Sequence, residues 1–309
     1  MYSFNKGHVL PIKLSVNYST SNTAKDDIQV LDEEIKSEIN YERNIKINDE
    51  LFINASHELK TPLNIIYSAA QLIELYQQIG DTNTDKISSS VNSIIQNSLR
   101  LMKVINNILD LNKIESGLFN LNYNYINIVE VVEDVVQTVS KTIKSKNLNF
   151  IFDTNAEEKY IMVDTEKIQR VLLNVLSNAV KFSNYGGDIF INVTVKDSSV
   201  ELSIIDKGIG IEKRYLDNIF NRFGQVDKSL SRKAEGSGIG LKLSKAIIEA
   251  HGGSINVFSM YNKGSTFIIK LPSKNDTVYT LYSKKIINYD SLTEMIRTEF
   301  SDIDDGSIN

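Results

Sequence analysis

The sequence predicts a chain of two parts: an all-α helical hairpin, followed by an α+β two-layer sandwich. Only three prolines occur, and most glycines lie after position 180, so the first part can form long helices and the second part holds the tight turns. Apolar residues recur every three or four positions in the first part, whereas strand-like runs separate the helices in the second. The length of 309 residues fits two domains and an appendage, at roughly 100–200 residues per domain.

The first part reads as two helices joined by a turn. A long helix is expected from about 30 to 79, with a bend at Pro62, because proline removes a backbone hydrogen bond. A second helix is expected from about 86 to 116, with Gly117 as its C-terminal cap. A hairpin cannot bury its apolar seam alone, so we expect a homodimeric four-helix bundle. Packing of the seam on the second part of the chain is the alternative.

The second part mixes helices and strands. Helices are predicted at about 127–145, 165–182 and 238–251, and strand-like runs at 147–153, 188–196, 200–206, 254–260 and 265–272. Helices on one face of a mixed sheet give the two-layer sandwich. The pattern weakens beyond Pro272, so 274–309 is expected to be a partly ordered tail that ends in the acidic DIDD. The predicted domains are 1–28, 29–118, 119–273 and 274–309.

Composition excludes several functions. The chain has no cysteine and only three histidines, which excludes disulfides and thiolate metal sites and makes an all-histidine site improbable. A net charge of −5 and a pI near 5.4 argue against a nucleic-acid partner. No apolar run is long enough for a membrane span, and the N-terminus does not read as a signal peptide. We therefore expect a cytoplasmic location, although a fragment of a longer receptor would have the same composition.

His57, in FINASHELKTPLN, is the first candidate for chemistry. It lies two positions from Ala55 and from Leu59, so it faces away from the apolar stripe of the helix. A zinc-protease motif is excluded because Thr61 stands where the second histidine is required. The sequence therefore predicts a solvent-facing imidazole with Glu58 beside it, and a neutral imidazole nitrogen is a competent nucleophile near physiological pH.

Asn174 and Asn178 form the second candidate, because their i, i+4 spacing places both amides on one helix face. Two solvated polar residues would be the ordinary interpretation of that pair alone. Lys181 follows one turn later, and an amide oxygen with an ammonium group suits a magnesium–triphosphate surface.

Two glycine-rich segments are the third candidate. DKGIG at 206–210 follows an apolar strand, and GSGIGL at 236–241 opens a helix. Glycines let the backbone approach a ligand, and a helix start offers N–H groups to phosphate. Neither segment matches a dinucleotide fingerprint or a P-loop. Two such loops predict the floor and lid of a nucleotide site, with simple turns as the alternative.

In their order along the chain, these segments resemble the sensor histidine kinases of two-component signalling. HELKTP at 57–62 resembles the phosphoacceptor box, and the segment 173–182 resembles the asparagine box. DKGIGI, NIFNRFGQVD and GSGIGLKLSKAIIEAHGG are similar to the first glycine, phenylalanine and second glycine boxes, and KGSTF at 263–267 closes the series. The resemblance covers about 45–272. It implies a dimerisation and phosphoacceptor hairpin joined to an ATP-binding domain of the Bergerat type, shared with gyrase and the Hsp90 chaperones.

The resemblance also implies roles for individual residues. His57 would be phosphorylated, Glu58 would activate it, and Thr61 would help to position water when the enzyme removes phosphate from its partner. Asn178 would hold Mg²⁺, and Asp206 would accept a hydrogen bond from the adenine amino group. The remaining residues implied to contact ATP are Asn174, Lys181, Phe182, Gly208, Gly210, Arg222, Arg232, Gly236, Ser237, Gly238, Ile239, Gly240, Leu241 and Thr266.

Two positions depart from the family pattern. Lys207 stands where a small Thr or Asn is commoner, and we expect it to alter polar contacts near adenine. Phe182 replaces a frequent Tyr and keeps the ring without the hydroxyl. Neither change removes a group that the chemistry needs, so the resemblance implies an active enzyme.

The implied reaction is phosphorylation of His57 by ATP, then transfer to an aspartate on the receiver domain of a response regulator. The hairpin and the nucleotide boxes would approach each other through a hinge near 117–122. Two alternatives remain: a catalytically silent partner that binds ATP without turnover, and a serine kinase or ATPase of the same ATPase superfamily. The stretch HVLPIKLSV at 8–16 is similar to the closing strand of a PAS sensor domain, so the 1–28 segment is either a sensor remnant or an unrelated extension.

Overall fold

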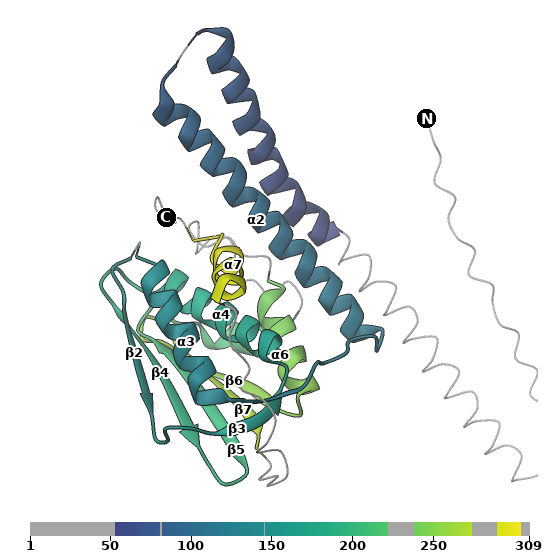
Figure 1. The fold of residues 1–309 in the computed structure, drawn as a ribbon, viewed down its shortest axis with the longest axis vertical. Coiled ribbons are helices and arrows are strands. Elements are labelled where there is room, and N and C mark those ends of the chain that lie inside the picture. The colour runs from purple at the N-terminus through teal and green to yellow at the C-terminus, as the bar shows by residue number, and fades with distance from the viewer. Residues whose placement is uncertain (1–52, 81, 145, 222–237, 274–288, 304–309) are drawn as a thin grey trace, which may run out of the picture. The chain divides into compact units, whose positions relative to one another are not determined.

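The computed structural model describes residues 53–80, 82–144, 146–221, 238–273 and 289–303. The described residues all belong to one compact unit, 53–309. That unit holds a helical hairpin and an α/β sandwich, which confirms the predicted fold class (Figure 1). None of the helices in these described ranges is long and apolar enough to cross a bilayer.

The hairpin has the second predicted helix and the described part of the first, whose predicted stretch 30–52 lies outside the described residues. The first is helical from 53 to 78 in the described residues and continues through Pro62. The second, α2 (Thr84–Glu115), begins where the Asn83 side chain accepts hydrogen bonds from the Asp85 and Lys86 amides. It ends at Glu115, and Gly117, two residues later, has a φ of +69°, the left-handed conformation that glycine adopts at low cost. The expected bend at Pro62 stays a prediction.

The sandwich is built on a five-stranded sheet of order β2-β4-β5-β7-β6. Its strands are β2 (Asn149–Thr154), β4 (Asp188–Val195), β5 (Ser199–Asp206), β6 (Ser254–Met260) and β7 (Gly264–Pro272). Only the β2–β4 pair is parallel. A separate antiparallel pair joins β1 (Asn124–Asn127) to β3 (Tyr160–Val163), and the sequence analysis predicted neither of these short strands.

One face of the sheet is covered by α3 (Ile128–Thr142), α4 (Thr165–Phe182) and α6 (Gly240–Ala250), as Figure 1 shows. Alternate residues of β5 are buried, which is the pattern of a strand with one face on a core. The valines and leucines of α3 and α4 complete that core. A short helix, α5 (Lys213–Leu216), follows β5.

The segment beyond Pro272 contains a helix that the sequence analysis did not predict. This helix, α7 (Tyr289–Glu299), places Leu292 and Ile296 in the core cluster, and Phe300 and Ile303 follow them there. The tail interpretation is therefore incomplete, because a packed helix lies within it. Its apolar residues recur at steps of four, four and three, but the polar residues between them hid that stripe.

Candidate nucleotide and phosphoacceptor site

His57 lies on the exposed side of the first hairpin helix, as the spacing predicted. Ala55 is buried, Leu59 is half-buried, and Glu58 beside the imidazole is half-buried. The Thr61 hydroxyl donates to the His57 carbonyl oxygen over 3.3 Å, one turn away at the position before Pro62. The arrangement leaves the imidazole open to an approaching group.

Helix α4 carries the two asparagines. Asp164 caps its start by accepting from the Lys167 amide, and a second oxygen of the same carboxylate accepts from the Asn122 amide over 2.8 Å. Asn174 is buried and donates to the Ser244 hydroxyl of α6 over 2.8 Å. Asn178, one turn further on, is half-buried. The two amides therefore differ: Asn174 joins α4 to α6, and Asn178 is the more accessible of the pair.

The end of α4 positions Lys181 and Phe182. Three carbonyl oxygens at this end, those of Val180, Lys181 and Ser183, accept from the Lys146 ammonium, which caps the helix. The Lys181 ammonium lies 3.1 Å from a carboxylate oxygen of Asp302 and 5.9 Å from the centre of the Phe182 ring. The predicted phosphate ligand is thus paired with a carboxylate of the C-terminal segment.

Asp206 ends β5 and is 5% exposed. One carboxylate oxygen accepts from the Gly208 amide over 2.8 Å. Burial raises the pKa of this carboxyl, against the opposing effect of hydrogen bonds from the Gly208 and Ser265 backbone amides. A buried acceptor held in place by backbone amides is suited to receive one more hydrogen bond from a ligand.

Glycines around Asp206 allow backbone segments to approach closely. A Cβ added at Gly208 would lie 2.2 Å from the Phe182 carbonyl oxygen, and one at Gly264 would lie 1.9 Å from that of Asp206. Gly210 has a φ of +62° and the Met260 carbonyl 2.0 Å from the position of its missing Cβ. These glycines are required for packing of the loop itself, which is how they shape the predicted adenine pocket.

The strand register shows which residue of β7 lies beside Asp206. Asp206 pairs with Ser265, so these two residues lie on the same, helix-covered face of the sheet. Thr266 pairs with Ile205 and therefore lies on the opposite face. Ser265, which is 7% exposed, is therefore a further candidate beside Asp206. Sequence reasoning named Thr266 without fixing the register, and a nucleotide contact at Thr266 stays a prediction.

Ser259 of β6 is a further residue that sequence reasoning missed. Its hydroxyl accepts from the Ile211 amide over 2.7 Å, donates to the Gly264 carbonyl, and lies 3.0 Å from the Ser265 hydroxyl. These bonds hold the loop after Asp206 against the β6–β7 pair. Only the three-dimensional pairing of these strands reveals this role.

Lys207 points along the sheet. Its ammonium lies 3.2 Å from a carboxylate oxygen of Asp188 and 4.9 Å from the centre of the Phe190 ring. Both partners belong to β4, so the ammonium is held by a neighbouring strand. The expected effect of Lys207 on polar contacts near adenine stays a prediction, and in this structure its ammonium is paired with β4.

The second glycine box opens α6. Gly238 has a φ of +64°, and a Cβ at Gly240 would lie 2.4 Å from the Asn174 side-chain oxygen. Ile239 is buried, and Leu241 is half-buried against the core. The predicted contacts Arg222, Arg232, Gly236 and Ser237 lie outside the described residues.

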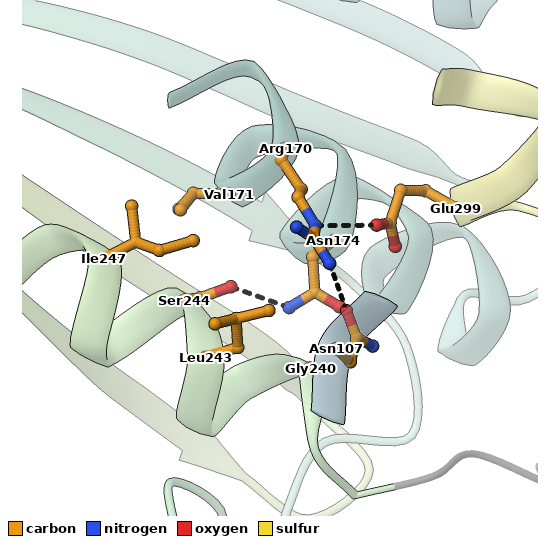
Figure 2. Close-up of a pocket in the computed structure, with 9 residues that line it drawn as sticks. All are labelled: Asn107, Arg170, Val171, Asn174, Gly240, Leu243, Ser244, Ile247 and Glu299. Atoms are coloured by element: carbon orange, nitrogen blue, oxygen red, sulfur yellow. Dashed lines mark hydrogen bonds and ion pairs between the residues drawn. The ribbon is translucent and has the colours of Figure 1, made fainter. Parts of the chain in front are cut away.

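Figure 2 shows the small pocket where α2, α4, α6 and α7 meet. At this pocket Asn174 of α4 is hydrogen-bonded to Ser244 of α6, and Arg170 lies one turn before Asn174 on α4. The Arg170 guanidinium donates to the Asn107 side-chain oxygen over 2.7 Å, pairs with Asp110, and lies 3.6 Å from Glu299. Sequence reasoning named none of Asn107, Asp110, Arg170 or Glu299, because no motif marks a contact between distant helices.

The residues present fit a magnesium nucleotide. Asp206 offers a buried acceptor for an exocyclic amino group, and Asn178 offers an amide oxygen on the face of α4. The described part of the chain contains no group of three or more carboxylate, histidine or cysteine side chains that could hold a metal. Mg²⁺ commonly takes one or two protein ligands and completes its shell with phosphates and water, so a single amide ligand is consistent with it.

Comparison with known families agrees with this geometry. Residues 47–117 match the His Kinase A (phospho-acceptor) domain, and residues 163–275 match the histidine kinase-, DNA gyrase B- and HSP90-like ATPase. The sensor histidine kinase WalK of Bacillus subtilis is 34% identical over 230 residues, which cover 74% of this chain and 37% of that protein. The chain spans less than half the length of the curated relatives it matches.

Two solved structures share the fold. The histidine kinase AdeS of Acinetobacter baumannii is 25% identical with a TM-score of 0.55, covering 71% of this chain and 98% of that one. The histidine kinase ThkA, in complex with the response regulator TrrA, is 23% identical with a TM-score of 0.56, covering 78% of this chain and 66% of that one. The exposed imidazole on the helical hairpin, the buried Asp206 carboxylate at the end of β5 and these matches lead to one conclusion: the chain belongs to the histidine kinases of two-component signalling.

Proposed function

We propose that this chain is an ATP-dependent autokinase that phosphorylates His57 and passes the phosphoryl group to an aspartate of a response regulator. The observation that carries the proposal is the presence, in one chain, of an exposed imidazole on a phosphoacceptor hairpin and a buried carboxylate acceptor in an ATPase fold. Each feature alone fits other functions. Together they supply both the nucleophile and the site for the phosphoryl donor.

In the proposed reaction an imidazole nitrogen of His57 attacks the γ-phosphorus of ATP. The bond from that phosphorus to the bridging oxygen breaks, ADP leaves, and the Glu58 carboxylate accepts or orients the proton on the other ring nitrogen. Asp206 receives the adenine amino group, and Asn174, Asn178 and Lys181 contact the phosphates. Mg²⁺ held at Asn178 would neutralise charge on the transferred group.

We propose that the active form is a homodimer through the hairpin. Helix α2 carries a stripe of five apolar residues, three, four or seven positions apart, that are 39% to 55% exposed in the single chain. They are Val91, Ile95, Met102, Ile105 and Leu109. A groove between the two hairpin helices is lined by Ile65, Leu72 and Tyr76. An apolar stripe of this spacing supports a bundle made with a second copy.

The second partner in this proposal is a receiver domain, which docks on the exposed surface around His57. The ThkA complex with a response regulator supports a partner of this class. Thr61 would act in the reverse direction, by positioning water during dephosphorylation of the regulator. The cytoplasmic location expected from composition stays a prediction.

Incubation with γ-labelled ATP and Mg²⁺ tests the proposal. We expect acid-labile, alkali-stable label on the wild-type chain, and none on His57→Gln. The variant should still bind a non-hydrolysable ATP analogue, since His57 is not among the nucleotide contacts. Mixing His57→Gln with a variant that cannot bind nucleotide then distinguishes transfer within a subunit from transfer across the dimer.

Other outcomes would contradict the proposal. Acid-stable label would indicate serine or threonine chemistry, and ATP hydrolysis without label would indicate an ATPase. Nucleotide binding without label or hydrolysis would indicate a catalytically silent partner.

A further inference from the structure

The C-terminal segment from 289 to 303 is packed into the fold. Leu292, Ile296 and Phe300 are each at most 1% exposed and belong to the same core cluster as α3 and α4. At its start, the Tyr289 hydroxyl donates to Asp134 of α3 over 3.2 Å. The segment is thus positioned by side chains along its whole described length, which fixes the place of the charged residues at its end.

Those charged residues join the hairpin to the ATP-binding domain. One Asp302 carboxylate oxygen lies 3.1 Å from the Lys103 ammonium of α2, and the other lies 3.1 Å from the Lys181 ammonium of α4. The two lysine side chains are 13% and 8% exposed, and that of Asp302 is 21% exposed. A single carboxylate therefore bridges a residue of the phosphoacceptor hairpin and a predicted phosphate ligand.

Neighbouring groups strengthen the same junction. The Glu299 carbonyl accepts from Lys103 over 2.5 Å and from the Ser177 hydroxyl of α4 over 3.1 Å. The Glu299 carboxylate lies 3.4 Å from Lys103 and 3.6 Å from Arg170. The Ser301 carbonyl accepts from Arg100 of α2 over 2.7 Å. Every one of these bonds runs from the C-terminal segment to α2 or α4.

The electrostatics agree with a strong pairing. Burial alone would raise the pKa of Asp302, but the two lysines outweigh it and hold the pKa at about 2. Asp302 is therefore ionised at neutral pH. A phosphate that approached Lys181 would meet this negative charge at the same ammonium group.

We propose that the segment 289–303 is an autoinhibitory latch, in which Asp302 occupies the position of a nucleotide phosphate on Lys181 while Lys103 ties the ATP-binding domain to the hairpin. The inference rests on the proposed function, because Lys181 is a phosphate ligand only if the chain binds ATP. Binding of the triphosphate and release of Asp302 are then competing states. Release also removes a restraint that keeps the ATP-binding domain on α2 when it must reach His57.

Asp302→Asn tests the latch, with Glu294→Gln as the matched control. The control removes a carboxylate from an exposed position of α7, in the same C-terminal segment as Asp302. We expect Asp302→Asn to bind a non-hydrolysable ATP analogue with Mg²⁺ about five-fold more tightly than wild type, because an ion pair of this kind is worth about that factor. Adenosine, which has no phosphate to place on Lys181, should bind both proteins equally.

The same variants should differ in the rate of phosphoryl transfer from ATP to His57. Initial labelling of His57 at subsaturating ATP should be faster in Asp302→Asn and unchanged in Glu294→Gln. In the wild-type chain, the ATP analogue should increase amide hydrogen exchange within 289–303, and adenosine should not. Lys103→Gln loosens the latch from the hairpin side and should also speed labelling, which keeps the test available if Asp302→Asn does not fold.

Unchanged analogue affinity and unchanged labelling in folded Asp302→Asn would overturn the latch. An equal gain in Glu294→Gln would also overturn it, since the effect would then follow net charge and not position. Failure of the proposed function looks different: the wild-type chain itself would bind no nucleotide or carry no label on His57.

Discussion

The hairpin and the ATP-binding domain differ in how far their apolar residues are buried. In α4 the apolar residues Ile168, Val171, Leu172, Val175 and Leu176 are each at most 1% exposed, because α3, α6 and the sheet cover the helix from several sides. In α2 the residues Ile95 and Leu109 are 55% and 52% exposed, although the helix is longer and has a regular stripe. Both helices are amphipathic, but the apolar side chains of α4 are buried within the chain and those of the α2 stripe are exposed to solvent.

This contrast shows which part needs a partner. A domain that buries its own apolar residues can fold as one unit, whereas a two-helix hairpin buries its exposed apolar stripe by packing against another molecule. The difference also separates the two functions. On the proposed function, nucleotide binding would depend on contacts inside one chain, and the phosphoacceptor hairpin would depend on assembly with a second copy. Variants in each region should therefore have separable effects.

The largest expected effect is on stability. Leu172→Ala removes a side chain that is 1% exposed and should lower the free energy of unfolding by about 2–5 kcal/mol. Leu63→Ala makes the same chemical change at a hairpin position that is 54% exposed, and should change the stability of the monomer by about 0.5 kcal/mol or less. Denaturant unfolding at low protein concentration measures both. If both variants lost a similar free energy of unfolding, the proposed difference between the buried helix α4 and the exposed hairpin would be wrong.

The next effect is on assembly. The double variant Ile95→Lys, Leu109→Lys places two charges on the exposed stripe of α2 and should weaken dimerisation by about 100-fold, since each lysine would have to be desolvated at the interface. Affinity for an ATP analogue should stay within two-fold of wild type. Sedimentation and nucleotide titration on the same samples check this. A dimer of wild-type affinity would place the interface elsewhere.

A smaller effect is expected at the adenine site. Asp206→Asn should weaken binding of the ATP analogue by about 10- to 50-fold, because a charged acceptor becomes a neutral one. Burial raises the pKa of Asp206, so ionisation of this group in the folded state costs stability as pH rises through that pKa. The variant should therefore be at least as stable as wild type at pH 7.

The pH dependence of binding gives a second readout for Asp206. As pH is lowered, protonation of Asp206 should weaken binding of the ATP analogue to the wild-type chain. Because the pKa of Asp206 is raised, this loss should begin at a higher pH than for an ordinary aspartate, whose pKa is about 3.9. The fall should be absent in Asp206→Asn. If Asp206→Asn lost affinity at low pH just as the wild-type chain does, the group that titrates would be a residue other than Asp206.

The smallest effect is expected at Lys207. Its ion pair with Asp188 is exposed, and such pairs contribute roughly 0.2–1 kcal/mol. Lys207→Ala should change affinity for the ATP analogue by less than about two-fold, since the ammonium is held on β4. A larger loss would show that this lysine reaches the nucleotide after all.

Much of the site could be predicted from sequence because its parts are local. The exposure of His57 follows from its position relative to Ala55 and Leu59 on one helix, and α4 (Thr165–Phe182) begins and ends where it was predicted. The glycines at 208 and 210 follow a strand and adopt the turn that their lack of a Cβ allows. Helical period, capping and turn chemistry act over a few residues, so one sequence contains them.

The remaining features depend on contacts between distant segments. The position of Ser265 beside Asp206 required the register of β5 with β7, and a shift of one residue moves every side chain to the other face. The bridge from Lys103 through Asp302 to Lys181 joins positions up to 199 residues apart. Sequence determined which residues can do chemistry and on which local element each one lies. Tertiary structure decided which of them meet, because long-range packing and charge pairing have no period along the chain.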